Sequence, residues 1–238
     1  MAFRTLQISE SDGKSFTGHL SIPPSGKGPG LLLLQEVYGV NADIKAAAEY
    51  YAAAGYAVLA PDLLWRQAAN LEYAYAERDQ AAETLRKLGG IDPILPDLAV
   101  AAEALRHAPE FDGTRLGVLG FGFGGVLAQL AVGRKLLQVD AGVAFFPGRL
   151  DLSLAPQLTQ PWLFHFGEHD SVAQPRGIDR LTAAAFATRK DVAVHTYEGV
   201  LHGFSIPGRK EFDAVAARQA TVRTLDFLSR SIGWRTVA

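Results

Sequence analysis

Three segments of the sequence combine residue types and an order that fit acyl-transfer chemistry. Residues 120–125 are Gly-Phe-Gly-Phe-Gly-Gly, Asp170 ends a Gly-Glu-His-Asp segment, and His202 precedes Gly203. An aspartate that orients an imidazole, and an imidazole that moves the proton of a nucleophile, form the relay that cleaves esters and amides. In enzymes with a parallel sheet, the nucleophile turn, the acid and the histidine follow one another in this order. The three segments therefore predict hydrolytic chemistry.

The glycine-rich segment supports two interpretations. In the first, Gly120, Gly122 and Gly125 form the G-x-G-x-x-G loop that binds a dinucleotide between a strand and a helix. In the second, the segment is a nucleophile elbow, G-x-nucleophile-x-G, with Gly122 at the nucleophile position. A dinucleotide loop also needs an acidic residue about 20 positions later, at the end of the next strand. Asp140 has this spacing but precedes the next predicted strand, so the elbow is favoured.

Alternating strand and helix patterns place these segments at one edge of a predicted sheet. Strands are predicted at 3–8, 16–22, 31–34, 57–60, 116–119, 142–146, 162–166 and 192–197, and helices at 41–54, 72–88, 95–108, from 126, at 179–188 and at 212–229. The first two strands are expected to form a hairpin, and the alternation beyond them predicts a mostly parallel sheet with helices on both faces. Reactive residues in such α/β sheets gather just beyond the carboxyl ends of the strands.

The composition is that of an ordinary globular protein. The 238 residues are 48% hydrophobic and 20% charged, which fits one domain over residues 1–238. The net charge is −2, and the lysines and arginines are dispersed, so neither a nucleic-acid nor a membrane partner is expected. The N-terminus lacks a signal-peptide pattern, and no apolar run approaches the roughly 18 residues of a membrane span. A cytoplasmic location is therefore expected.

The sequence gives no reason to expect a metal or a cofactor. It contains no cysteine, which excludes disulfides, thiolate metal ligands and thiol catalysis. His165, His169 and Asp170 are close in sequence, but they span a predicted strand end and a turn rather than one face of a helix. We therefore predict no metal site and no cofactor.

Together, these segments resemble those of the dienelactone hydrolases, a family of α/β-hydrolases, over nearly the whole chain. Residues 35–41, Gln-Glu-Val-Tyr-Gly-Val-Asn, resemble the family segment Q-E-[IV]-[FY]-G-V-N, which few other α/β-hydrolases contain. The family's next strand end, elbow, acid loop and histidine loop are matched by residues 61–63, 120–125, 167–170 and 202–204. In the elbow, G-[FY]-C-x-G-G, Gly122 replaces the cysteine. The resemblance implies an α/β-hydrolase fold and a monomer that acts on a small-molecule ester or lactone.

The resemblance also implies catalytic roles for the matching residues. Glu36 matches the carboxylate that holds and helps to activate the family's resting thiol. Asp170 and His202 match the acid and the histidine of the catalytic triad. The backbone amides of Val37 and Phe123 match the donors of the oxyanion hole, which need no particular side chain.

The substrate-binding positions match the family less completely. Arg78 either matches the arginine that binds a substrate carboxylate or is a solvated helix residue, and the sequence leaves both open. Tyr38 and Phe204 are expected to contribute aromatic surface to the substrate pocket. A second carboxylate-binding arginine, expected four residues after the histidine, is replaced by Ile206. A less charged ester or lactone is therefore favoured over an anionic dienelactone.

Gly122 is the departure with the largest consequence, because no acyl-enzyme can form without a side chain at that position. Three interpretations remain. The chain is a natural ligand-binding member that lost hydrolase chemistry, its nucleophile was removed by substitution, or Asp170 and His202 activate water directly in the space beside Gly122. The sequence alone does not separate them.

Overall fold

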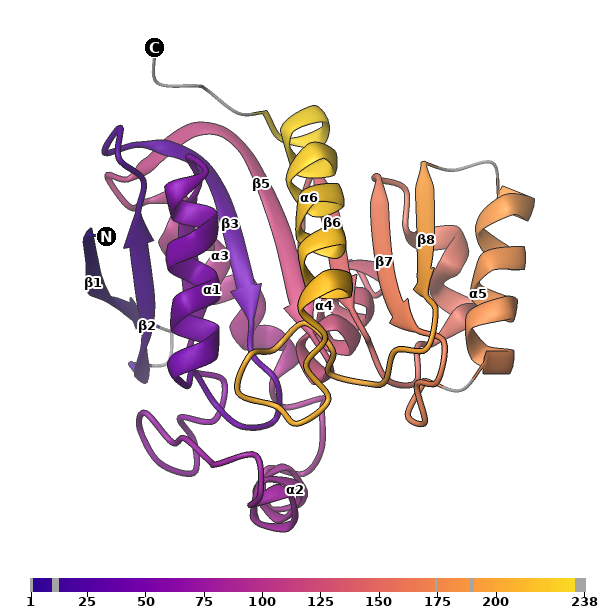
Figure 1. The fold of residues 1–238 in the computed structure, drawn as a ribbon. Helices are drawn as coiled ribbons and strands as arrows, with labels where there is room; N and C mark the ends of the chain where they lie inside the picture. Colours follow the sequence, from indigo (N-terminus) through magenta and orange to yellow (C-terminus); the bar gives the residue numbers. More distant parts are fainter. Residues whose placement is uncertain (1, 10–12, 174, 189–190, 234–238) are drawn as a thin grey trace.

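The computed structural model describes residues 2–9, 13–173, 175–188 and 191–233 of the chain (Figure 1). In these residues, eight strands form one sheet in the order β1-β2-β4-β3-β5-β6-β7-β8. They are β1 (Ala2–Ser9), β2 (Ser15–Ile22), β3 (Gly28–Leu34), β4 (Ala57–Pro61), β5 (Phe111–Phe121), β6 (Ala141–Phe145), β7 (Trp162–Gly167) and β8 (Val192–Tyr197). β2 pairs antiparallel with β1 and β4, and the other pairs are parallel. The predicted, mostly parallel sheet is confirmed.

Helices cover both faces of this sheet. They are α1 (Ala42–Ala53), α2 (Arg78–Lys87), α3 (Leu95–Arg106), α4 (Phe123–Gly133), the 3-10 helix η1 (Leu152–Gln157), α5 (Pro175–Thr188) and α6 (Ala214–Ser231). α1 and α6 pack on one face, and α3, α4 and α5 pack on the other (Figure 1). Alternate leucines of β3 divide between the two cores, as the pleat of a strand buried on both faces requires. α2 lies apart, beyond the carboxyl edge of the sheet (Figure 1).

The largest departure from the predicted elements is the helix expected at 72–88, which is confined to α2. The residues before α2 form a loop held by hydrogen bonds to its neighbours. The backbone N–H of Tyr73 donates to the carbonyl oxygen of Tyr38 at 3.0 Å, and the Tyr75 hydroxyl donates to Asp43 at 2.7 Å. These tertiary contacts outweigh the weak helical preference of the segment.

β7 is fixed on its α6 side by a buried hydrogen-bond network. His165 has no exposed surface, and its Nδ1 and Nε2 lie 2.9 Å from Tyr197 Oη and 3.0 Å from Thr224 Oγ1. Burial, followed by the charges of His195 and Arg223, holds the pKa of His165 well below its usual value of 6.5. The imidazole is therefore neutral in the folded protein, on the strand that leads to the predicted catalytic acid.

The folded protein is expected to lose stability below about pH 6.5, because His165 stays neutral when folded and takes up a proton once unfolded. In this range the unfolded chain binds more protons, so the free energy of unfolding rises with pH, by up to about 1.4 kcal/mol per pH unit for one group. Urea denaturation of the wild-type protein and of His165→Gln, between about pH 7.5 and about pH 5.5, measures this slope. The substitution should flatten it, and equal slopes would contradict a neutral buried imidazole.

Candidate active site

The turn between β5 and α4 has the geometry of a nucleophile elbow. Gly122 has φ 50° and ψ −109°, a conformation that glycine adopts at far lower cost than other residues, and its N–H donates to the carbonyl oxygen of Phe145 at 2.9 Å. A Cβ atom on Gly120 would lie 2.2 Å from the carbonyl carbon of Gly124. A Cβ atom on Gly124 would lie 2.3 Å from the carbonyl oxygen of Leu34. The close approach of helix and strand at the elbow therefore requires glycine at both flanking positions.

Asp170 and His202 meet at the same edge of the sheet, in the loops after β7 and β8. Nδ1 of His202 donates to Oδ2 of Asp170 at 2.9 Å and to Oδ1 at 3.1 Å. The backbone N–H groups of Val172 and Ala173 also donate to Oδ1, each at 2.8 Å. The Asp170 side chain is fully buried, whereas His202 remains 16% exposed. The carboxylate is thus fixed by backbone donors and can hold the imidazole in one orientation.

Phe146, which no sequence pattern singled out, packs against the imidazole. It follows β6 with φ 36°, unusual for a residue with a side chain, and its N–H donates to the carbonyl oxygen of His165 at 2.6 Å. Its ring meets the ring of His202 edge-on, with centroids 5.0 Å apart and an interplanar angle of 71°. Backbone strain of this kind is retained where the surroundings impose it, often beside functional groups. Phe146 therefore limits the positions of the His202 ring by packing, in addition to the hydrogen bonds from His202 to Asp170.

Glu36 follows β3 in a turn that the side chain of Gln35 holds. Nε2 of Gln35 donates to the carbonyl oxygen of Glu36, and the N–H of Leu63 donates to Oε1 of Gln35, both at 3.3 Å. These two bonds join the loop after β3 to the loop after β4. They explain why glutamine is useful at this position, since its amide both donates and accepts.

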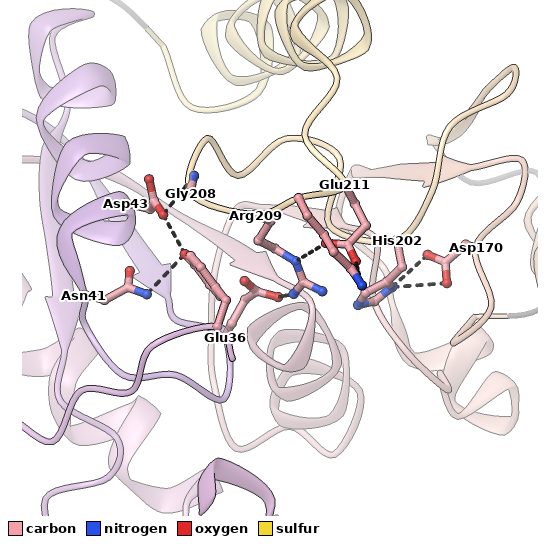
Figure 2. A network of polar contacts seen from close by, with 10 residues as sticks. Glu36, Asn41, Asp43, Asp170, His202, Gly208, Arg209 and Glu211 are labelled. Atoms are coloured by element: carbon pink, nitrogen blue, oxygen red, sulfur yellow. Dashed lines mark hydrogen bonds and ion pairs between the residues drawn. The ribbon is translucent and has the colours of Figure 1, made fainter. Parts of the chain in front are cut away.

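Glu36 forms a buried ion pair with Arg209, from the loop after β8 (Figure 2). Nη1 of Arg209 donates to Oε1 of Glu36 at 2.8 Å, and Nε donates to Glu211 at 3.4 Å. The guanidinium carbon lies 5.9 Å and 5.7 Å from the ring centroids of Tyr38 and Tyr75. Burial raises the pKa of Glu36, although the charges of Arg209 and His202 oppose this rise.

The loop after His202 supplies Arg209 to the pocket, although the position four residues after the histidine holds Ile206. Ile206, at the expected position, is buried in the core, and Arg209 reaches the site from three residues further on. Successive turns bring it there, with hydrogen bonds from Ile206 N to Gly203 O and from Arg209 N to Ile206 O, both at 3.1 Å. Gly203 leaves room for the side chain, because a Cβ atom there would lie 2.3 Å from Nε of Arg209.

Asp43, near the start of α1, joins the elements around Arg209. Its Oδ2 accepts hydrogen bonds from the Tyr75 hydroxyl at 2.7 Å and from the N–H of Gly208 at 3.2 Å (Figure 2). Asn41 donates to the same hydroxyl at 3.1 Å while its Oδ1 accepts from the N–H of Ile44, capping α1. The loops before α2 and after β8 are thereby tied to one helix end.

These elements enclose a cavity of about 510 Å³ at the carboxyl edge of the sheet. Its polar wall contains Glu36, His202, Arg209 and Glu211, and two exposed arginines, Arg78 and Arg149, lie on its other sides. Apolar side chains complete the lining: Ala82, Leu85, Ile91, Val126, Val172 and Leu201. A mostly apolar cleft with a few convergent polar groups is typical of a site for a small molecule.

A model of the dienelactone hydrolase family matches residues 16–232. The chain belongs to the dienelactone hydrolase family. Carboxymethylenebutenolidase 1 from Cupriavidus pinatubonensis is 31% identical over 229 residues, which cover 94% of this chain and 95% of the relative. The carboxymethylenebutenolidase of Pseudomonas putida is 30% identical over 228 residues, with the same coverage. A dienelactone hydrolase-like promiscuous phosphotriesterase from metagenomic libraries has the same fold, with a TM-score of 0.80 at 22% identity over 98% of this chain and 99% of that one.

The fold is accordingly the α/β-hydrolase fold of a hydrolytic family, and most of the predicted site residues meet in one place. The cavity is lined by Glu36, Val37, Tyr38, Arg78, Gly122, Phe123 and His202, and Asp170 lies behind His202. Phe204, expected to line the pocket, lies in the core instead. It is fully buried and packs against Phe146 and Tyr197, with ring centroids 5.9 Å and 5.0 Å apart. Phe204 therefore reaches the site only through Phe146, whose ring contacts His202.

The dinucleotide interpretation of the glycine-rich segment does not fit this dienelactone hydrolase fold. Asp140 precedes β6, and its Oδ2 accepts a hydrogen bond from the N–H of Leu116 at 2.9 Å. This contact lies at the amino edge of the parallel strands, away from the elbow. The carboxylate is therefore not placed to bind a ribose beside Gly122.

Neither a metal-binding cluster nor a membrane-spanning helix is present among the residues that the structure describes. Within residues 2–9, 13–173, 175–188 and 191–233, no three or more His, Cys, Asp or Glu side chains cluster as a metal ion would require. In the same part of the chain, no helix has the length and apolar character needed to cross a membrane. Of the histidines considered for a metal, His165 is buried against β8 and α6, whereas His169 is exposed beside Glu168.

Gly122→Ala is expected to destabilise this dienelactone hydrolase-family fold by about 1 kcal/mol, because alanine is strained at a positive φ. The added Cβ would also lie 3.0 Å from Oε1 of Glu36, so the carboxylate would have to shift by a few tenths of an ångström. Urea denaturation at neutral pH measures the difference. A clear increase in the denaturation midpoint would count against a strained elbow at residue 122.

Proposed function

We propose that the chain binds a small ester or lactone in the cavity beside Gly122 and is a dienelactone hydrolase-family hydrolase that lacks the covalent nucleophile. The observation that supports this most directly is the Asp170–His202 pair, held on the cavity that Gly122 and Glu36 also line. An orienting carboxylate and an imidazole are useful for acyl transfer, and they are retained here beside a nucleophile position without a side chain.

The proposed binding mode uses backbone and side-chain donors. The N–H groups of Val37 and Phe123 would hold the carbonyl oxygen, and the N-terminus of α4 would favour the negative charge that develops there. Arg209 is engaged by Glu36 and Glu211, which leaves Arg78 and Arg149 as the arginines open to a ligand. A neutral or singly charged ester or lactone suits this cavity.

A short-chain aryl ester tests the enzymatic proposal. The wild-type protein is expected to hydrolyse it slowly but above the buffer rate, and His202→Ala should lower kcat at least about tenfold. His107→Ala is the matched control, since His107 is an exposed histidine at the end of α3, remote from the cavity. It should keep the wild-type rate.

A second candidate, a ligand-binding pseudo-hydrolase, is favoured by Gly122 alone. Absence of turnover together with saturable binding of a non-hydrolysable ester analogue, measured by calorimetry, would support it over the enzyme. Failure of both turnover and binding would contradict the proposed function in either form.

A further inference from the structure

The place that a side chain of residue 122 would take borders Glu36 and Phe146. A Cβ atom built on Gly122 would lie 3.0 Å from Oε1 of Glu36 and 3.4 Å from Cε2 of Phe146. A separation of 3.0 Å is closer than carbon and a carboxylate oxygen normally approach. Because Gly122 has no side chain, this place is open to the cavity that Glu36 and Gly122 both line. A water molecule in that space, at non-bonded distance from the Gly122 α-carbon, would have the Glu36 carboxylate beside it as a hydrogen-bond acceptor.

Glu36 is a fixed carboxylate with acceptor capacity to spare. Its side chain is only 5% exposed, and Arg209 holds Oε1 at 2.8 Å. Oε2 is buried and accepts no hydrogen bond from any residue that the structure describes. Arg209 is itself held by Glu211 and lies beside the rings of Tyr38 and Tyr75, so it keeps its place against the carboxylate. The raised pKa of Glu36, caused by its burial, is in keeping with a stronger base than an exposed glutamate.

We propose that Glu36 is the general base that activates a water molecule beside Gly122, so that the chain hydrolyses an ester directly, without a covalent intermediate. This rests on the proposed function, because it requires the ester carbonyl to be bound at Val37 and Phe123. In this proposal Glu36 activates the water, whereas one interpretation of the sequence gave that role to Asp170 and His202. His202 faces the same cavity and is left to hydrogen-bond the water or the leaving group.

The reaction is balanced with water as the only co-reactant. One proton passes from the water to the Glu36 carboxylate as the water oxygen bonds to the carbonyl carbon. The π electrons of the carbonyl move to its oxygen, to which the amides of Val37 and Phe123 donate. When the double bond re-forms, the bond from carbon to the alkoxy oxygen breaks with its electron pair. Glu36 then returns the proton to the alkoxide, which gives a carboxylic acid, an alcohol and the original carboxylate.

The test compares steady-state hydrolysis of an aryl ester by the full wild-type chain, Glu36→Gln, Gly122→Ala and His202→Ala. Glu36→Gln should lower kcat by a factor of about 10² or more, as loss of a general base does, and should change KM little. Gly122→Ala should lower kcat because its methyl group fills part of the space that the water needs. Both variants should still bind a non-hydrolysable ester analogue with the wild-type affinity. Mass spectrometry of quenched wild-type reactions should detect no acyl adduct.

Each other outcome overturns a specific claim. If Glu36→Gln keeps more than half of kcat while His202→Ala abolishes it, the base is His202 and the proposal fails, although the proposed function stands. If the wild-type protein has no turnover but Gly122→Cys acquires it, the water route fails and the hydrolase scaffold stands. An acyl adduct on the wild-type chain also overturns the proposal. If no form turns over and no analogue binds, the proposed function itself is wrong.

Discussion

Replacing Gly122 with cysteine is expected to raise the rate of aryl-ester hydrolysis by a factor of about 10² or more. The groups that we propose to serve a covalent hydrolase lie around this position: Asp170 is hydrogen-bonded to His202 at 2.9 Å, and Glu36 is 3.0 Å from the point where the new Cβ would lie. When a triad enzyme loses its nucleophile, substrate binding and the oxyanion hole alone still accelerate the reaction by about 10³–10⁴ over the uncatalysed rate. A restored thiol would increase this remaining rate further. Stopped-flow assays should show a burst of alcohol release.

The same variant has a direct chemical control. The chain contains no cysteine, so iodoacetamide should modify the variant at residue 122 only. Gly122→Ser should gain less, because a thiolate forms far more readily than an alkoxide near neutral pH. Combining Gly122→Cys with His202→Ala should remove most of the gain. If the folded cysteine variant gains no rate and its thiol reacts no faster than a free thiol, the surrounding groups do not act as hydrolytic machinery.

Gly124→Ala is expected to destabilise the protein by about 3 kcal/mol, the largest stability loss predicted here for a single methyl group. Its Cβ would lie 2.3 Å from the carbonyl oxygen of Leu34 and 2.6 Å from that of Gln35. These are backbone atoms at the end of the central strand β3, so the conflict cannot be relieved by rotating a side chain. Helix α4 would have to move away from the sheet. Chemical denaturation measures the loss.

Gly177→Ala is the matched control for that substitution. Gly177 lies in α5, and a Cβ atom there would meet no other atom within 4 Å. Alanine should therefore leave stability unchanged or raise it by about 0.5 kcal/mol through its better helix propensity. Equal losses for the two variants would show that contact with the β3 backbone does not decide the effect.

The sequence predicted the sheet and the elbow because both depend on local patterns. The run of leucines in β3 is what a strand buried on both faces requires, and Gly120 and Gly124 satisfy close contacts between adjacent elements. The limits of β5 were less predictable. Only 116–119 has the apolar pattern, whereas the strand extends over Phe111–Phe121 through its pairing with β3. The start of α2 was not predictable for the same reason. The residues before it form a loop that is held by contacts with other segments, such as the hydrogen bond from Tyr75 to Asp43.

Within the candidate site, sequence reasoning found residues that follow strands and missed residues that long-range packing brings in. Asp170, His202 and Glu36 each lie in a loop that follows a parallel strand, so the sheet brings them to one edge. Arg209 reaches the site because the loop after β8 turns at Gly203 and again at Ile206. Its distance along the sequence from His202 therefore differs from the four residues expected from the family pattern. Phe146 has no signature at all, because its role depends on a positive φ and a ring contact with His202.

The backbone of the elbow is set by its flanking glycines and by the hydrogen bond from residue 122 to β6, none of which involves a side chain at residue 122. Thiol, hydroxyl or carboxylate groups at this position would all start from the same α-carbon. The elbow residues therefore fix the position of the α-carbon, whereas residue 122 alone decides which chemical group is presented there. Glycine and cysteine codons can differ by a single base. A lineage with this fold can therefore lose or regain covalent catalysis in one mutational step without rebuilding the framework around it.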